Sequence, residues 1–270
     1  MSEHTARAYE IDLTQFNSFC PNQYNESTLP SKTVRRWIAQ LSTMGICSKS
    51  IHRKLSSLRS YYKYLQHSYG EQNQPMTKVT SPKLQKRIVK DIPAMDLYHM
   101  FKNFPWDEHE NGTRDRLILL TLYSCGLRIS ELIGLHGKDI DLYKNELRVL
   151  GKRNKVRLVP LHTELADCFK ELNIKAQDSV FVLDNGKPLY PMYLNRLVHK
   201  YLKLFSSAQK TNPHTLRHSF ATHLLNNGAN LMAIKDLLGH SSLAATQVYT
   251  KNDIAKLKRM HALHPRDAKK

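Results

Sequence analysis

The sequence lacks long apolar runs. No stretch approaches the roughly 18 consecutive apolar residues of a membrane-spanning helix, and the N-terminus, MSEHTARAYEIDL, has no apolar segment behind a basic start. We therefore expect neither a membrane span nor a secretory signal. With only 10 Gly and 11 Pro in 270 residues, and with 41% hydrophobic residues, the chain is neither collagen-like nor mostly disordered.

Cysteine and metal-binding motifs are also sparse. The cysteines at positions 20, 47, 125 and 168 form no CxxC pair, which argues against a zinc ribbon or a disulfide framework. We expect a reducing cytoplasm, with Cys125 and Cys168 as small core residues. There is no GxxxxGK[ST] phosphate loop, no HExxH and no carboxylate cluster suited to two magnesium ions, so we expect no metal and no cofactor.

Acidic residues are few relative to basic ones. The chain has 41 Lys and Arg against 23 Asp and Glu, a formal net charge of +18. Such an excess opposes compaction by self-repulsion and favours a polyphosphate partner. No basic amphipathic helix stands out at a terminus, which disfavours a membrane surface and favours nucleic acid. A basic but merely solvated or ribosome-associated surface is the alternative.

Residues 1–75 have the periodicity of a small helical bundle. Tyr9, Leu13 and Phe16 share one helical face, and similar stripes follow at 34–41, which Gly45 would end, and at 51–65. Arg53, Lys54 and Arg59 fall mostly off the last stripe. We expect them to face solvent or DNA.

Residues 76–93 have the composition of a linker, with prolines and no sustained period. The basic residues Lys83, Lys86, Arg87 and Lys90 make this linker a candidate for DNA contact. A plain solvated connection is the alternative.

Residues 94–270 mix helices with short strands. A nearly continuous apolar helix at 115–123 precedes Gly126. Strand patterns at 146–150 and 155–161 flank a turn and predict a hairpin, and 179–183 predicts a third strand. Further helices are expected at 192–205, 213–226 and 231–238. The predicted class is mainly α with a small antiparallel sheet.

One segment, TNPHTLRHSF, has the features of an anion site. Asn212 can cap the helix and Pro213 suits its first turn. His214 and Arg217 then share a face near that N-terminus, where the helix dipole and a guanidinium favour a phosphate. The i, i+4 pair of His214 and His218 could instead bind a metal, but no other ligand lies nearby in the sequence.

Other candidate residues are separated along the chain. Arg128 follows a helix end, Lys152 lies in the hairpin turn, and Gly239 is a plausible helix C-cap before His240, with Tyr249 nine residues later. Each has an ordinary alternative, such as a surface ion pair or a solvated turn residue.

Taken in order, Arg128, Lys152, His214-x-x-Arg217, His240 and Tyr249 resemble the catalytic set of the tyrosine recombinases. The strings GLRISEL, GKRNKVRLVPL, HTLRHSFATHLL, LLGHSS and QVYT carry this resemblance, which is closer to the Xer subgroup and covers essentially the whole chain. The implied fold is a SAM-like helical core-binding domain, 1–75, followed by a linker and a tyrosine-recombinase catalytic domain, 94–270.

The resemblance also implies residue roles. Tyr249 would attack a DNA phosphodiester to give a 3′-phosphotyrosyl link and a 5′-hydroxyl. Arg128, Arg217 and His240 would hold the phosphate, His214 would assist removal of the tyrosine proton, and Lys152 would protonate the leaving oxygen. Glu131 would brace Arg128. Arg153, beside Lys152, is a further candidate for DNA contact.

The implied partners are a double-stranded recombination site and other protomers. In such relatives, two DNA sites join in a tetramer of identical or paralogous chains and exchange strands through a Holliday junction. A DNA translocase is a further candidate partner. The resemblance implies a location at the nucleoid in the cytoplasm and a role in chromosome partition and cell division. The tail containing Ile254, Leu257, Met260 and Leu263 is expected to pack on a neighbouring protomer, with packing in cis as the alternative.

Three other functions stay open from the sequence. A mobile-element or phage integrase, or an invertase, would use the same chemistry. A type IB topoisomerase would relax supercoils without needing two sites. A non-catalytic DNA-binding protein could retain the fold, although the complete set of candidate catalytic residues argues against it.

Overall fold

The computed structural model describes residues 3–20, 25–84, 91–151, 154–208, 210–239 and 251–266. The chain divides into two compact units, Met1–Arg87 and Ile88–Lys270. We describe each unit separately and call the second the catalytic unit, because it contains the candidate catalytic residues Arg128, His214 and Arg217.

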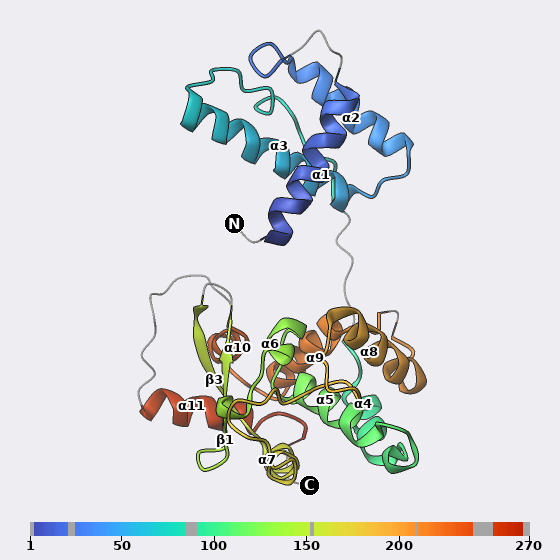
Figure 1. Cartoon of the computed structure of the whole chain (residues 1–270), viewed down its shortest axis with the longest axis vertical. Coiled ribbons are helices and arrows are strands. Elements are labelled where there is room, and N and C mark those ends of the chain that lie inside the picture. The colour runs from blue at the N-terminus through green and yellow to red at the C-terminus, as the bar shows by residue number, and fades with distance from the viewer. Residues whose placement is uncertain are drawn as a thin grey trace. The chain divides into compact units, whose positions relative to one another are not determined.

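The first unit is a helical bundle, as its apolar stripes predict. Helix α1 (Glu3–Phe19) packs against α3 (Ser48–Tyr69), and α2 (Ser31–Thr43) also contacts α3 (Figure 1). Phe16 and Trp37 meet edge to face with their rings 5.0 Å apart in the core. The backbone of Gly45 has φ +76° just after α2, the left-handed conformation in which helices commonly end.

The segment after α3 also packs on this bundle. Met76 and Val79 are buried in its core. The side-chain Nδ2 of Asn73 donates to the backbone carbonyls of Glu26 at 2.7 Å and Leu29 at 3.0 Å. Residues 76–79 are therefore held on the bundle, whereas the sequence pattern predicted that a linker begins at residue 76.

Helix α5 (Gly112–Ser124) lies at the centre of the catalytic unit. It is buried along nearly its whole length, as predicted for 115–123, and packs against α7 (Thr163–Glu171) and α9 (Pro213–Asn226). Helix α4 (Ala94–Asn103) packs on α8 (Pro191–Phe205). Short 3₁₀ helices occupy Trp106–Glu108 and Gly137–Asp139.

A three-stranded antiparallel sheet forms the other part of the unit's framework. Its order is β1 (Ile140–Asp141), β2 (Glu146–Leu150) and β3 (Val156–Pro160), with Leu147 opposite Val159 across the predicted hairpin. The third strand is not 179–183 as expected. That segment makes only isolated bridges, because its backbone bonds turn from residues 135–136 to residues 187–188.

Helices α10 (Leu231–Leu238) and α11 (Lys251–His261) pack beside β3 (Figure 1). Leu257 of α11 is buried in the core of its own unit, and Met260 and Leu263 pack against that core. In the single chain, these three residues pack in cis, where α11 meets α10 and β3. The expected contact of the tail with a neighbouring protomer stays a prediction, and the side chain of Ile254 lies outside the described residues.

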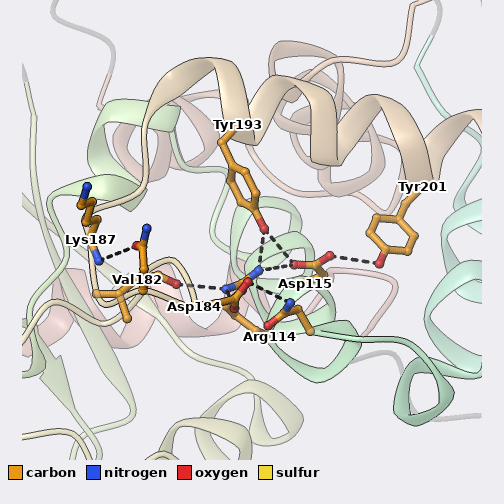
Figure 2. A network of polar contacts seen from close by, with 9 residues as sticks. Arg114, Asp115, Val182, Asp184, Lys187, Tyr193 and Tyr201 are labelled. Atoms are coloured by element: carbon orange, nitrogen blue, oxygen red, sulfur yellow. Dashed lines mark hydrogen bonds and ion pairs between the residues drawn. The ribbon is translucent and has the colours of Figure 1, made fainter.

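A polar network ties the start of α5 to α8 (Figure 2). The buried carboxylate of Asp115 accepts the hydroxyl of Tyr201 at 3.0 Å, and Arg114 donates to the hydroxyl of Tyr193 at 2.6 Å. Arg114 also pairs with Asp184 at 2.5 Å. Burial raises the pKa of Asp115 despite these bonds. The network therefore ties α8 to the start of α5.

Candidate active site

The described part of the candidate site is built around a buried carboxylate, Glu131. It lies in the first turn of α6 (Ile129–Ile133), where its Oε2 accepts the backbone N–H of Arg128 at 2.9 Å. Its Oε1 accepts Nη1 of Arg128 at 2.6 Å. The carboxylate thus caps the helix and holds the side chain of Arg128, as expected for an acidic residue at the third helical position. The Arg128 side chain stays 27% exposed.

The turn between α5 and α6 depends on Gly126. Its φ is +57°, and an added Cβ would lie 2.6 Å from a ring carbon of Phe220. Only glycine fits this conformation and this close approach without displacement. The turn brings Arg128 to the same end of α5 as Arg217 of α9, which packs beside it.

Arg217 is held by two backbone carbonyls. Its Nη1 donates to the carbonyl of Gly126 and its Nη2 to that of Leu238, each at 2.5 Å. Its Nη1 also lies 3.6 Å from Oε2 of Glu131. A guanidinium has five N–H donors, so these contacts position Arg217 without using all of its hydrogen-bonding capacity.

A third guanidinium, Arg157 of β3, pairs with the same carboxylate. Its Nη1 and Nη2 donate to the two oxygens of Glu131 at 2.9 and 2.8 Å, and its Nε donates to the carbonyl of Leu237 at 2.7 Å. This residue was not among the site residues predicted from the sequence. The signal that could have found it is the period of two in the strand, which places Arg157 on the same inward face as buried Val159.

These contacts shift the titration of the site. Burial alone would raise the pKa of Glu131, but the hydrogen bonds and charge of Arg157, joined by those of Arg128, outweigh it and lower the pKa to about 2. Burial first, and then the charge of Arg128, lower the pKa of Arg217 to about 10. At neutral pH three guanidiniums therefore surround one carboxylate, leaving two positive charges in excess.

His214 lies at the first turn of α9, as predicted. Asn212 caps this helix by accepting the backbone N–H of Thr215 at 3.0 Å, and Pro213 is its first residue. The side chains of His214 and His218 are exposed. The helix N-terminus with His214 is a favourable place for an anion.

Three of the candidate catalytic residues, Lys152, His240 and Tyr249, lie outside the described residues, as does Arg153. The residues next to them are described. Gly151 donates its N–H to Lys155 at 2.7 Å across the hairpin turn, and Gly239 ends α10 with φ +63°, the predicted C-cap.

The candidate DNA-contacting residues of the first unit differ in exposure. Arg53, Arg59 and Lys83 are exposed. The expectation that Lys54 faces solvent is wrong: its ammonium is buried, donating to Asp12 Oδ1 at 3.0 Å and to Gln15. The carboxylate of Asp12, on α1, draws it inward. Lys86, Arg87 and Lys90 are outside the described residues.

Within the described ranges, no helix is both long and apolar enough to cross a bilayer. Nor do those ranges bring three His, Cys, Asp or Glu side chains into a group able to hold a metal ion.

Known proteins that resemble this chain in sequence are phage integrases and tyrosine recombinases. The sequence model of the Phage integrase family matches residues 94–256, and that of the Phage integrase N-terminal SAM-like domain matches residues 1–68. The chain is 35% identical to Tyrosine recombinase XerC of Chlorobaculum parvum over 98% of this chain and 90% of that protein. It is 34% identical to Tyrosine recombinase XerD of Proteus mirabilis, over 98% of this chain and 88% of that one.

Solved structures share the fold. The Tn1549 transposon integrase in complex with circular intermediate DNA matches with a TM-score of 0.73 at 21% identity, over 96% of this chain and 94% of that chain. The XerH site-specific recombinase bound to a palindromic difH substrate matches with a TM-score of 0.71 at 22% identity, over 95% and 78%.

Proposed function

The chain belongs to the phage integrase family of tyrosine recombinases, and we propose that Tyr249 is the nucleophile with which it cuts and rejoins DNA. The protein is a site-specific DNA recombinase of the Xer type. The observation that carries the proposed mechanism is the cationic site around Glu131, where Arg128, Arg157 and Arg217 converge on one buried carboxylate. Its excess positive charge suits a phosphodiester.

The proposed reaction is a transesterification. The phenolic oxygen of Tyr249 attacks phosphorus, forms a 3′-phosphotyrosyl bond and releases the 5′-oxygen of the neighbouring nucleotide. A free tyrosine has a pKa of about 10, so ionising it at pH 7 costs roughly 4 kcal/mol. In this proposal His214 accepts the proton of Tyr249, and the nearby cations favour the ionised form.

Arg128 and Arg217 stabilise the charge that develops on the non-bridging oxygens. Their value lies in being fixed before the substrate arrives, since preorganised donors need no rearrangement in the transition state. Arg217 is held by two carbonyls and Arg128 by Glu131. His240 adds a hydrogen bond to the phosphate, and Lys152 gives a proton to the leaving 5′-oxygen.

The energetics require no other reactant. The phosphotyrosyl diester conserves the energy of the DNA phosphodiester, so the 5′-hydroxyl of a second strand reseals the break by the reverse step. Neither ATP nor a metal-activated water takes part in this cycle.

DNA is held by both units in this proposal. Exposed Arg53 and Arg59 on α3, with Lys83 after it, contact the backbone from the first unit, and Lys86, Arg87, Lys90 and Arg153 extend the contact. Arg53 also pairs with Asp12, but its side chain is 46% exposed. Lys54 is not included because its side chain is buried against Asp12. The net charge of +18 predicts binding that weakens steeply with salt.

The biological role we propose is resolution of chromosome or plasmid dimers at the nucleoid. It requires a tetramer of identical or paralogous chains on two DNA sites, and a DNA translocase is the candidate activator. The Xer names of the relatives by sequence favour this role over that of a mobile-element integrase.

The decisive test is covalent capture of DNA. The cognate site is first recovered by sequencing DNA crosslinked to the protein in its own cells, and is then placed in a nicked suicide duplex. We expect a covalent protein–DNA adduct that Tyr249→Phe abolishes. The matched control is Tyr143→Phe, because Tyr143 is 96% exposed; this variant should form the adduct at the unaltered rate.

Arg217→Ala should slow adduct formation by orders of magnitude while most DNA affinity remains. A protein that binds the duplex tightly but forms no adduct would instead support the non-catalytic alternative. Adduct formation by Tyr249→Phe would assign the nucleophile to another residue.

A further inference from the structure

Arg157 has an unusual position for a charged strand residue. It lies on the inward face of β3 and is only 4% exposed. Taking a guanidinium out of water costs several kcal/mol, and replacing a buried ion pair by apolar side chains is often neutral or stabilising. Stability alone therefore gives little reason for an arginine here.

The contacts of Arg157 show what it does instead. Its two Nη groups take both oxygens of Glu131, at 2.9 and 2.8 Å, in a two-point contact that fixes the plane of the carboxylate. Oε1 of Glu131 also accepts Nη1 of Arg128 at 2.6 Å and so holds the guanidinium of Arg128. The orientation of Glu131, and through it that of Arg128, is thus set from β3.

Arg157 also reaches the end of α10. Its Nε donates to the carbonyl of Leu237 at 2.7 Å, and the next carbonyl, that of Leu238, accepts Nη2 of Arg217 at 2.5 Å. Gly239 follows directly, and a Cβ there would lie 3.1 Å from Cδ of Arg157. The same helix end is therefore bound by Arg157 on one carbonyl and by Arg217 on its neighbour.

We infer that Arg157 is a positioning residue for strand cleavage: by its two-point contact with Glu131 and its bond to the end of α10, it fixes Arg128 and Arg217. It need not touch the DNA. The inference rests on the proposed function, in which these two arginines bind the scissile phosphate. A displacement of reacting groups by about 1 Å can cost on the order of 100-fold in rate, so loss of Arg157 should affect the chemical step more than DNA binding.

The first experiment compares full-length Arg157→Lys and Arg157→Gln with the unaltered protein on the nicked suicide duplex carrying the recovered site. Lysine keeps the charge but cannot make the two-point contact or the Nε bond. We expect single-turnover cleavage to fall about 100-fold in both variants, with the Kd for the duplex within about threefold.

The matched control is Arg114→Gln, which removes a partly buried arginine, 20% exposed, from the network around Asp115 and Asp184 (Figure 2). It should lower the stability of the catalytic unit, yet the folded fraction should cleave at the unaltered rate. This control separates positioning from a general loss of packing.

The second experiment is a pH profile of cleavage. The charged groups that face Glu131 among the described residues are Arg128 of α6, Arg157 of β3 and Arg217 of α9. Without Arg157, fewer favourable contacts oppose the effect of burial on Glu131, so the pKa of Glu131 rises. The cleavage rate of Arg157→Gln should then decrease at acidic pH, where the rate of the unaltered protein does not. The double variant Glu131→Gln/Arg157→Gln should lack that fall, because it has no carboxylate to titrate.

The outcomes separate the two proposals. If the unaltered protein forms no adduct, the proposed function fails. If the unaltered protein forms the adduct, two results would show that the assignment of Arg157 is wrong. One is a cleavage rate of folded Arg157→Lys within about threefold of the unaltered rate. The other is an equal loss of DNA affinity and of cleavage rate in that variant. A pH profile of Arg157→Gln that matches that of the double variant would also overturn it.

Discussion

Replacing Glu131 by glutamine should destabilise the catalytic unit by about 3 kcal/mol at neutral pH. A fall in the pKa of Glu131 from its ordinary 4.5 to about 2, at about 1.4 kcal/mol for each tenfold change, corresponds to roughly this energy. The side chain is only 3% exposed, so solvent screening removes little of it. Glutamine can accept from one guanidinium, but its amide N–H groups face the others, which then repel one another.

The sign of the pH dependence follows from the lowered pKa. Glu131 contributes its full stabilisation above the unfolded pKa of about 4.5, and the contribution is lost as the pH falls through the folded value of about 2. The difference in unfolding free energy between the two proteins should therefore shrink from about 3 kcal/mol at pH 7 to about 1 kcal/mol near pH 3.

The assay is urea unfolding followed by tryptophan fluorescence. The chain has two tryptophans, Trp37 in the first unit and Trp106 in the catalytic unit. In a Trp37→Phe background the signal reports the catalytic unit alone, and the midpoint shift multiplied by the slope gives the free-energy difference. A difference below about 1 kcal/mol at pH 7, or one that does not shrink on acidification, would refute the electrostatic account of Glu131.

Three further predictions concern other parts of the chain. Tyr201→Phe removes the 3.0 Å bond to buried Asp115 and should cost about 1–3 kcal/mol in urea unfolding of the catalytic unit, with no effect on the cleavage rate of folded protein. Lys54→Met deprives Asp12 of a buried partner and should destabilise the first unit by about 1–3 kcal/mol, read from Trp37 fluorescence; a selective loss of DNA affinity instead would count against its structural role. Gly239→Ala places a side chain at φ +63° and should lower the unfolding free energy of the catalytic unit by about 1–2 kcal/mol. An unchanged melting temperature of that unit would contradict this prediction.

Much of this protein could be predicted because its signals are local. The buried helix at 112–124, the hairpin, the Asn212 cap and the left-handed end at Gly239 depend on residues within a few positions of one another. The small sheet was predicted as a class but its third strand was not, since a two-residue strand at 140–141 carries almost no periodic signal.

By itself, the sequence determined the helical first unit, the helices near 115–123, 192–205, 213–226 and 231–238, the strong positive charge and the spacing of the candidate catalytic residues. It did not indicate α4 or α7. Only the tertiary structure decided which charges are buried. Lys54 turns inward because Asp12 lies on another helix, and Arg157 meets Glu131 across 26 residues of chain. A charged side chain can be buried only where the folded structure provides an opposite charge and hydrogen-bond partners for it. Those partners come from distant segments, so no local pattern reveals them.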